Sequence, residues 1–425
     1  MSYETAFTMD TSSIKFGPGV TKEVGYDMKK LGVKRVMVVT DPNLTNSEAV
    51  TVTLKALKDE NIEGVLFDQV RVEPTDSSFK KAIKFAQEGK FDGFIGVGGG
   101  SSMDTAKIAN LFSTYTADFL DYVNKPIGKG IPVPGPLKPM IAIPTTAGTG
   151  SETTGVAIFD LEAMHAKTGI AHRTLRPIMG IVDPNNTRTL PKIATASCGF
   201  DVICHALESI TAIPFNSRPA PESLDLRPAY QGANPISHLW ASKAVEMVSK
   251  YIVRVVQDSS DDEARAAMIL ASTYAGIGFG NAGVHLAHGM SYPVSGMVRE
   301  YLPEGFISDH PIIPHGMCVV LVSPAVFRFT AKTNPRLHLE VAQLMGVDIS
   351  DIKENEAGDV LASEIIKLMK ATGIPNGLEA VGYGPSDIED LVQGTLPQHR
   401  VTKLSPRPAS AEDLKQLFKD SMTLW

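Results

Sequence analysis

The first 190 residues alternate short runs of β-branched and other apolar residues with longer amphipathic stretches. The short runs are typical of buried strands, and the stretches between them are typical of helices. Repeated alternation favours a parallel sheet covered by helices on both faces, which binds ligands at the carboxyl ends of its strands. We expect strands at 36–39, 65–67, 94–97, 141–143, 156–159 and 178–182, and helices near 20–31, 47–60, 77–89 and 103–113.

After Leu190 the pattern becomes mostly helical. One helix is expected to begin at Ser237 as its N-cap, and another at Asp261 and Asp262. The proline-rich segment Ser217–Pro235 is expected to be an ordered excursion or a flexible loop, because helical sequence with candidate site residues lies on both sides of it. Two further helices are expected at 357–371 and 411–424.

Composition excludes several classes of protein. The 425 residues are 43% hydrophobic and 20% charged, as in an ordinary globular protein, and the net charge of −7 comes without a Lys/Arg-rich run, so no nucleic-acid partner is expected. No stretch is apolar for about 18 residues, so no membrane partner is expected. The three cysteines have no framework spacing and indicate a reducing compartment. The N-terminus lacks the features of signal and transit peptides, which predicts a cytoplasmic protein or a processed organellar form.

Two glycine-rich segments follow predicted strands. GVGGGSSMDTAK (Gly96–Lys107) opens a helix, where glycines let a pyrophosphate approach the backbone and the helix N-terminus offers free N–H groups. It does not match G-x-G-x-x-G, so a tight structural turn is the alternative. PTTAGTGSETT (Pro144–Thr154) adds hydroxyls that have no packing purpose in a core. The candidate dinucleotide-binding residues are Gly98, Gly99, Gly100, Ser101, Asp104, Thr145, Thr146, Thr149 and Ser151.

Asp41 stands at the end of the strand predicted at 36–39. An acidic side chain there accepts a hydrogen bond from a ribose 2′-hydroxyl and repels a 2′-phosphate, which favours NAD over NADP. The alternative is a simple turn residue before Pro42.

A metal site is indicated by Asp201 and His205, which are four residues apart and share one face of a helix. His288 and His315 are both flanked by glycine and lie in other predicted helices. One carboxylate and three imidazoles suit Fe(II) or Zn(II). The sequence therefore predicts that these four residues bind one divalent cation.

Other groups near this site leave alternatives open. Cys198 and Cys204 flank the D-x-x-x-H pair, so either is an alternative ligand. His285 lies three residues before His288 and is expected to support the ligands or relay a proton, or to line the site without a role. The remaining histidines are expected to be surface or structural residues: His165, His172, His238, His310, His338 and His399.

In this order, GGGSSMD, PTTAGTGSETT, GFDVICHALES, the His288 region and PHG resemble the iron-containing alcohol dehydrogenases over essentially the whole chain. The resemblance implies an α/β dinucleotide-binding domain with a parallel sheet (1–190) and a mostly α-helical metal-binding domain (191–425), the fold shared with dehydroquinate synthase. It implies NAD, a divalent metal bound by Asp201, His205, His288 and His315, and a homodimer. We expect Fe2+, with Zn2+ as the alternative.

The resemblance has one departure. Many members carry a further histidine four residues after the third ligand, serving the nicotinamide or a proton path, and this chain has Tyr292 there. A phenol titrates near pH ~10, which argues against simple acid–base transfer at that position. The catalytic candidates are therefore His288, Tyr292 and His285, and Lys167 stands at the family's distance for contacting the cofactor.

Longer blocks, among them VRVEPTDSS, RPAYQGANPIS, GFGNAGVHLAHGMSYP and GTLPQHRVTKL, resemble one branch of this family, in which a hydride passes from a hydroxy acid to an oxo acid. The resemblance implies that 4-hydroxybutyrate and 2-oxoglutarate give succinate semialdehyde and (R)-2-hydroxyglutarate through a nicotinamide that stays bound. It allows the mitochondrial matrix for a processed form and the cytoplasm for a bacterial one. The alternative is an NAD-dependent alcohol or 4-hydroxybutyrate dehydrogenase that releases NADH. Arg218, Arg227 and Arg299 are candidates for binding the carboxylates.

Overall fold

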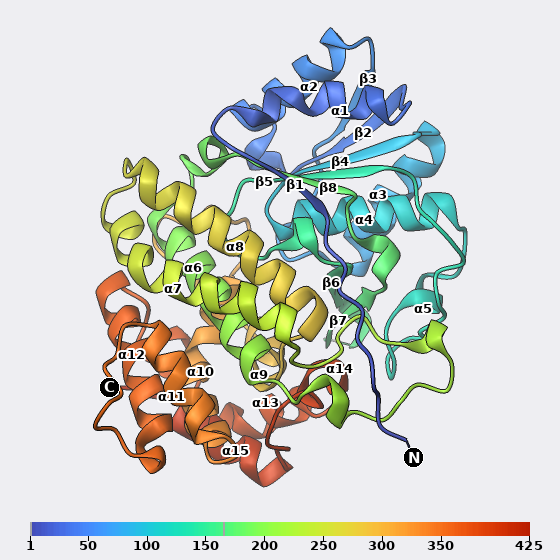
Figure 1. The fold of residues 1–425 in the computed structure, drawn as a ribbon. Helices are drawn as coiled ribbons and strands as arrows, with labels where there is room; N and C mark the ends of the chain where they lie inside the picture. The colour runs from blue at the N-terminus through green and yellow to red at the C-terminus, as the bar shows by residue number, and fades with distance from the viewer. Residues whose placement is uncertain (1, 165) are drawn as a thin grey trace. The chain divides into compact units, whose positions relative to one another are not determined.

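The computed structural model describes residues 2–164 and 166–425, so the expectation for His165 lies outside the described residues. The chain divides into two compact units (Figure 1). One unit is Asp10–Leu190, and the other joins the chain up to Met9 to Pro191–Trp425. The N-terminal segment therefore belongs with the C-terminal part of the chain, which the sequence did not indicate.

A six-stranded sheet forms the centre of the Asp10–Leu190 unit, and all its neighbouring strands are parallel. The predicted α/β fold with a parallel sheet is confirmed. In spatial order the strands are β1 (Ser13–Phe16), β8 (Met179–Val182), β5 (Met140–Pro144), β4 (Gly93–Gly98), β2 (Arg35–Val39) and β3 (Glu63–Phe67).

Helices cover both faces of this sheet because its strands are apolar on both sides. Val36 and Val38 pack in the core cluster that includes α1 and α2, whereas Met37 and Val39 pack in the cluster that includes α3 and α4. Successive side chains of a strand point to opposite faces, so β2 alone contributes to both cores. The four helices are α1 (Val24–Lys30), α2 (Glu48–Asp59), α3 (Asp76–Gly89) and α4 (Gly100–Thr114).

Two strands differ from the expectation. The run predicted at 156–159 is β6 (Val156–Leu161), but it pairs antiparallel with β7 (Ala166–Ala171) in a separate ribbon and not with the parallel sheet. The edge strand β1 was not predicted, because its four residues are partly exposed and carry no continuous apolar run.

The helical unit is built around α6 (Lys192–Thr211), which packs against α7, α8 and α10. The N-cap of α7 is Asn234, whose side chain accepts a hydrogen bond from the Ser237 backbone N–H at 2.9 Å, so the prediction of Ser237 as the cap is wrong. Asp261 caps α8 as predicted. The other helices are α5 (Phe119–Tyr122, in the sheet unit), α7 (Pro235–Gln257), α8 (Asp262–Ala282), α9 (Leu286–Gly296), α10 (His315–Ala331), α11 (Pro335–Leu344), α12 (Ala357–Thr372), α13 (Ile388–Thr395), α14 (His399–Thr402) and α15 (Ala411–Asp420).

The segment 217–235 is an ordered excursion that holds the start of the chain. The Glu4 backbone N–H donates to the Arg218 carbonyl at 2.9 Å, and the Ala220 N–H donates to the Ser2 carbonyl at 2.9 Å. The Arg227 guanidinium pairs with the Glu4 carboxylate at 3.0 Å. These contacts explain why the first residues belong to the helical unit.

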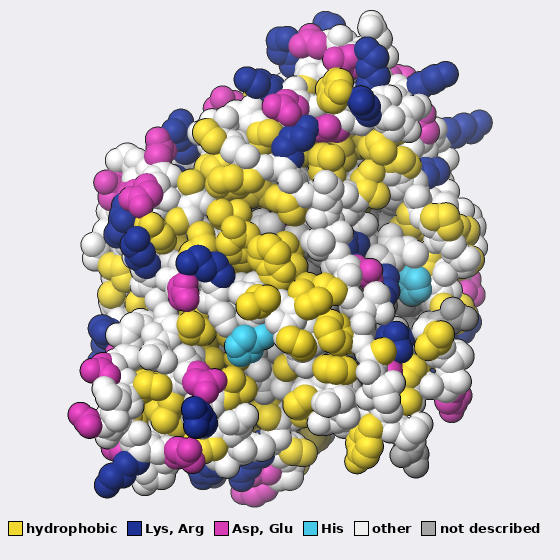
Figure 2. Space-filling model, in the orientation of Figure 1, with side chains coloured by type: hydrophobic (Ala, Val, Ile, Leu, Met, Phe, Trp, Pro, Cys, Tyr) yellow, Lys and Arg dark blue, Asp and Glu magenta, His cyan; other side chains and the backbone are white. Residues whose placement is uncertain are grey.

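Helix α6 departs from the expectation that no long apolar stretch exists. Among the described residues it is long and apolar enough to cross a membrane, with a mean hydropathy of 1.2, but 89% of that window is buried inside the protein. A core helix passes the same test, and α6 carries Asp201, His205 and Glu208 on its buried length. On the face shown in Figure 2, basic and acidic side chains are interspersed.

Candidate metal centre and nucleotide site

Helix α6 places three polar side chains in the interior of the helical unit. Asp201, His205 and Glu208 follow one another at spacings of four and three residues, which puts them on one face of the helix. Their exposed fractions are only 2%, 5% and 0%. Buried carboxylates are rare unless they are paired or bind a cation.

Asp201 Oδ1 lies at the centre of three imidazoles. It is 3.6 Å from His205 Nε2, 3.7 Å from His288 Nε2 and 3.7 Å from His315 Nε2. These distances are too long for good hydrogen bonds. They match ligands on a shared ion, because two ligands about 2.1 Å from a tetrahedral metal lie roughly 3.4 Å apart.

The donor atoms fit a divalent cation. Ligand atoms of Asp201, His288 and His315 all lie within 4.8 Å of one another. His205 falls outside that set of three, although it approaches the same carboxylate oxygen and its ring stacks on Phe279 at 3.8 Å. Asp201 Oδ1 and His288 Nε2 are buried without a hydrogen-bond partner, a costly state that a bound cation would relieve.

The electrostatics of the cluster differ between its members: Asp201 and His205 are held in the forms that bind metals, whereas His288 is held protonated. Burial raises the pKa of Asp201, but the neighbouring charges of His205 and His315 lower it more, so the pKa lies well below its usual range. Burial lowers the pKa of His205, which keeps that imidazole neutral. Burial also lowers the pKa of His288, but the charges of Glu208 and Asp201 outweigh it and raise that pKa to about 9. A carboxylate and a neutral imidazole are the forms that bind metals, so a cation bound at His288 would displace its proton.

Two glycines allow the ligand helices to pack closely on their neighbours, α10 on α6 at Gly316 and α9 on α14 at Gly289. A Cβ on Gly316, beside His315 in α10, would lie 2.0 Å from the Ser197 carbonyl oxygen. A Cβ on Gly289 in α9 would lie 2.6 Å from Thr402 Cγ2, so α14 also packs closely. A side chain at Gly316 would displace backbone, and one at Gly289 would displace at least the side chain of Thr402.

Glu208 orients His288, and the sequence analysis missed it. Its Oε2 accepts a hydrogen bond from His288 Nδ1, and its Oε1 accepts one from the Ala287 backbone N–H at 2.6 Å. Burial raises the pKa of Glu208, but the charges of His285 and His288 more than offset this, so its pKa lies below its usual value. Fixing Nδ1 leaves Nε2 for a metal. The glutamate seven residues after Asp201, on the same helix face, was the signal available.

His285 contacts Glu208 and not the ligand oxygen of Asp201. Its Nδ1 accepts from the Leu286 backbone N–H at 2.7 Å and lies 3.1 Å from Glu208 Oε1. Its Nε2 lies 2.9 Å from Thr211 Oγ1. His285 is fully buried as the N-cap of α9, where its ring lies beside Glu208 without a hydrogen bond to it.

Tyr292 lies one helical turn beyond His288 in α9 and is 5% exposed. Its hydroxyl accepts a hydrogen bond from Arg400 Nη2 at 2.6 Å. Tyr292 is therefore held by a guanidinium from α14.

The cysteines stand outside the ligand set. Cys204 Sγ lies 3.2 Å from Ser323 Oγ, and Cys318 Sγ donates to the Ile313 carbonyl at 3.2 Å. Burial raises the pKa of Cys204 and raises that of Cys198 to about 12. Metals bind thiolates, so these protonated thiols are poor ligands compared with the imidazoles.

In the sheet unit, the junction of β4 and α4 leaves no room for side chains. Gly98 has a φ of 149°, and a Cβ there would lie 2.4 Å from Ser102 Oγ. A Cβ on Gly100 would lie 2.8 Å from Thr149 Cγ2. Gly99 is the N-cap of α4 and has no side chain to cap the helix. The first backbone N–H groups of α4 are therefore available to an anion.

The segment after β5 lies beside this junction. The Thr145 N–H donates to the Gly98 carbonyl at 3.0 Å. Thr146 Oγ1 and Ser102 Oγ are buried without a partner. Unpartnered hydroxyls beside a helix N-terminus fit a phosphate-bearing ligand.

Asp104 and Ser151 belong to an internal network with Lys107. Ser151 Oγ donates to Asp104 Oδ1 at 2.6 Å, and Asp104 Oδ2 accepts from the Ile158 N–H at 3.0 Å. Lys107 is fully buried and donates to Ser151 Oγ at 2.5 Å and to the Val156 carbonyl at 2.8 Å. This network fastens the segment after β5 to α4.

The other predicted nucleotide residues also have internal partners. One carboxylate oxygen of Asp41 accepts from the Asn43 N–H at 2.9 Å, as in the turn that was the alternative, and burial raises its pKa. Ser101 Oγ accepts from the Glu73 N–H at 3.2 Å, and Glu73 pairs with Lys167. Contact of these residues with a nucleotide stays a prediction.

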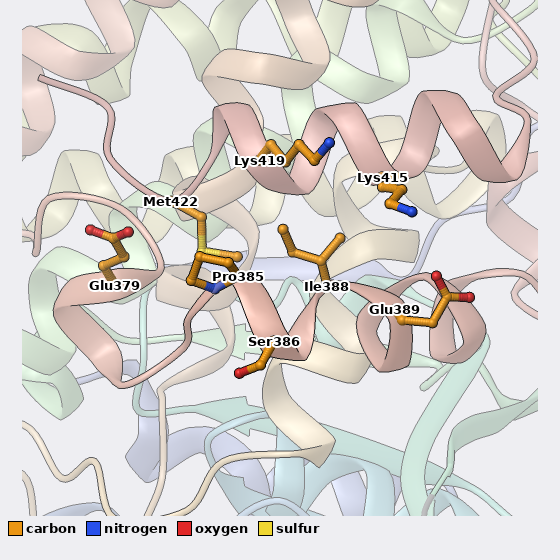
Figure 3. A pocket seen from close by; sticks show the side chains of 8 residues that line it. All are labelled: Glu379, Pro385, Ser386, Ile388, Glu389, Lys415, Lys419 and Met422. Atoms are coloured by element: carbon orange, nitrogen blue, oxygen red, sulfur yellow. The ribbon is translucent and has the colours of Figure 1, made fainter.

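One surface pocket of the helical unit contains none of the predicted site residues (Figure 3). It has a volume of about 530 Å³ and lies between side chains of α13 and α15. Its lining residues are Glu379, Pro385, Ser386, Ile388, Glu389, Lys415, Lys419 and Met422.

Comparison with known families places the chain in a class. Residues 11–184 match the family described as iron-containing alcohol dehydrogenase, and residues 229–422 match its C-terminal part. The chain therefore belongs to the iron-containing alcohol dehydrogenase family of oxidoreductases, as the resemblance predicted. Among solved structures, 1,3-propanediol oxidoreductase superposes with a TM-score of 0.86 at 26% identity, covering 98% of this chain and 100% of that one. Alcohol dehydrogenase from Oenococcus oeni superposes with a TM-score of 0.85 at 26% identity, again over 98% and 100%.

Within that family, the chain is similar to particular curated proteins. It is 54% identical over 422 residues to the mitochondrial hydroxyacid-oxoacid transhydrogenase of Bos taurus, covering 99% of this chain and 91% of the relative. The enzyme of the same name from Homo sapiens is also 54% identical, over 99% of this chain and 90% of the relative.

Glu208→Gln is expected to weaken metal binding, because a neutral amide holds His288 less firmly and makes it a poorer donor. The dissociation constant for Co2+ or Zn2+ should rise about 10- to 100-fold in chelator competition, with a changed visible spectrum of the Co2+ form. Glu364→Gln, whose partner is Lys367 at 3.0 Å, is the matched control. An affinity equal to that of the unsubstituted protein would contradict the role assigned to Glu208.

Lys107→Met is expected to destabilise the sheet unit even without nucleotide, because it leaves Asp104 and the Val156 carbonyl with fewer partners. The cost should be about 1–3 kcal/mol, seen as a lower Tm of the nucleotide-free protein. An unchanged Tm combined with weaker nucleotide binding would instead mean that Lys107 acts on the ligand directly.

Proposed function

We propose that this protein is a metal- and NAD-dependent hydroxyacid–oxoacid transhydrogenase. The observation that carries the proposal is the cluster of buried Asp201, buried His288 and partly exposed His315 around an unpartnered carboxylate oxygen. It stands in a chain that is 54% identical, over 99% of its length, to proteins of that name. A non-catalytic relative would be expected to have lost these ligands.

In this proposal Asp201, His205, His288 and His315 hold one divalent metal, Fe2+ with Zn2+ as the alternative, because the donor set suits either ion. When bound, such an ion supplies Lewis acidity toward a substrate oxygen. Glu208 keeps the imidazole of His288 oriented, as its hydrogen bond does already.

The sheet unit is proposed to hold NAD. Backbone N–H groups at the start of α4 bind the pyrophosphate, and the unpartnered Thr146 hydroxyl adds a donor. Asp41 accepts from the ribose. Asp104 and Ser151 position the loop rather than contact the nucleotide, given their internal bonds. The remaining proposed contacts are Gly98, Gly99, Gly100, Ser101, Thr145, Thr149 and Lys167.

The reaction balances without an external oxidant. Oxidation of 4-hydroxybutyrate removes a hydride from C4 and a proton from its hydroxyl, giving succinate semialdehyde. The nicotinamide stores the hydride and delivers it to C2 of 2-oxoglutarate, which takes up a proton to give (R)-2-hydroxyglutarate. The same nicotinamide serves both halves because it stays bound.

The curated relatives are named mitochondrial, so we propose the mitochondrial matrix for this chain, or the cytoplasm if its source is bacterial. We keep the homodimer as a prediction. The rival function is an NAD-dependent 4-hydroxybutyrate or alcohol dehydrogenase, which would use the same metal residues but release NADH after each turnover.

Labelled substrate distinguishes these functions. Metal-loaded protein, 4-hydroxybutyrate carrying deuterium on C4, 2-oxoglutarate and excess unlabelled free NADH are incubated together. We expect deuterium at C2 of 2-hydroxyglutarate, over many turnovers per chain and undiluted by the free pool, as read by mass spectrometry. Deuterium appearing in the free NADH pool, with unlabelled 2-hydroxyglutarate, would contradict the transhydrogenase and support the dehydrogenase.

A further inference from the structure

The arginines expected to bind substrate carboxylates already have partners. Arg218 Nη1 donates to the Gln231 carbonyl at 2.7 Å, and Arg227 pairs with Glu4 at 3.0 Å. Arg299 is exposed and pairs with Asp387 at 2.7 Å. The cation for a carboxylate therefore has to be sought elsewhere in the helical unit.

Arg400, in the short helix α14, is differently placed. It is half-buried, Nη2 donates to the Tyr292 hydroxyl at 2.6 Å, and the guanidinium lies 5.1 Å from the centre of the Tyr230 ring. Nη1 is buried and has no hydrogen-bond partner. Among the described residues 2–164 and 166–425, the side chains that stabilise the charge of Arg400 are Tyr292 and Tyr230, and no carboxylate is among them.

Two sets of contacts connect this guanidinium to the metal ligands. Along α9, Tyr292 is one turn from His288, an advance of about 6 Å. Through the rings, Tyr230 meets Phe279 edge-on at 6.4 Å, and Phe279 stacks on His205 at 3.8 Å. Arg400 is therefore connected to His288 through helix α9 and to His205 through the rings of Tyr230 and Phe279.

The guanidinium of Arg400 contacts two tyrosines but has no carboxylate partner, and its buried Nη1 is unsatisfied. An unsatisfied buried N–H is unfavourable. The planar fork of a guanidinium matches a carboxylate, with which it forms two parallel charge-assisted hydrogen bonds. The missing partner has the chemistry of a carboxylate ligand.

The two proposed substrates share such a carboxylate at the same place. In 4-hydroxybutyrate, two methylene groups separate the reacting C4 from the carboxylate. In 2-oxoglutarate, two methylene groups likewise separate the reacting C2 from the distal carboxylate. One positively charged side chain at a fixed distance from the metal can therefore orient the hydride donor and the hydride acceptor in turn. The rings of Phe279 and Tyr230 suit contact with the two methylene groups of each substrate.

We propose that Arg400 binds the carboxylate two methylenes away from the reacting carbon in both substrates, and that Tyr292 holds the guanidinium in place for this. The proposal rests on the proposed function and names the residue that makes the enzyme specific for hydroxy and oxo acids. It assigns Tyr292 a positioning role where many family members have a histidine.

The test compares Arg400→Gln with Arg299→Gln as the matched surface control. In Arg400→Gln, the KM for 4-hydroxybutyrate, the KM for 2-oxoglutarate and the inhibition constant of butyrate should each rise about 100-fold. The kcat should change far less, and 1-butanol oxidation and bound metal should be unchanged. Arg299→Gln should alter none of these constants.

Arg400→Lys keeps the charge but loses the fork, so a rise of about 10-fold in the same constants is expected; it also serves if the glutamine variant does not fold. Unchanged constants in a folded variant would overturn the role of Arg400 while the labelled-substrate result stands. If the unsubstituted protein turns over neither acid, the proposed function fails. Butyrate binding followed by calorimetry then still decides whether Arg400 binds a carboxylate.

Discussion

The helical unit depends on one buried carboxylate oxygen that three imidazoles approach and that no hydrogen bond satisfies. Asp201 Oδ1 lies 3.6 to 3.7 Å from the Nε2 atoms of three histidines. Asp201 belongs to the continuously buried part of α6, from Gly199 to Thr211. An arrangement of this kind is unfavourable unless a cation completes it. The packing of α9 and α10 on α6 brings the imidazoles of His288 and His315 close to that oxygen, where all three can bind one cation.

A second carboxylate on the same helix, that of Glu208, has hydrogen-bond partners where Asp201 Oδ1 has none. Glu208 accepts hydrogen bonds from His288 and from the start of α9. Asp201 is therefore free to bind a metal, whereas Glu208 orients the imidazole of His288. Gly316 and Gly289 complete the arrangement, because a side chain at Gly316 would displace backbone and one at Gly289 would displace at least the side chain of Thr402.

The sequence predicted the fold, which the structure confirms, and a set of metal ligands, which stays a prediction; both rest on local patterns. Apolar runs at the spacing of strands predicted five of the six sheet members, and D-x-x-x-H with two glycine-flanked histidines predicted Asp201, His205, His288 and His315. The antiparallel ribbon of β6 and β7 was not predicted, since pairing direction depends on contacts that a single strand does not carry. Glu208 and Arg400 were missed for the same reason: their roles come from partners about 80 and 108 residues away.

In the sheet unit, the glycines of the β4–α4 junction are required by close approach, whereas Asp104, Ser151 and Lys107 form bonds within the protein. The sequence motifs marked all of these residues alike, and only their contacts distinguish the glycines proposed to bind the nucleotide from the network that fastens the loop.

We propose that helix α6 supplies Asp201 and His205 to the metal, while Glu208 on the same helix stays outside the ligand set. The most direct test is anomalous diffraction from crystals of the metal-loaded protein. We expect a single metal peak within about 2.0–2.3 Å of Asp201, His205, His288 and His315. A peak bonded to Glu208 or His285 instead, or ligands from elsewhere in the chain, would contradict it.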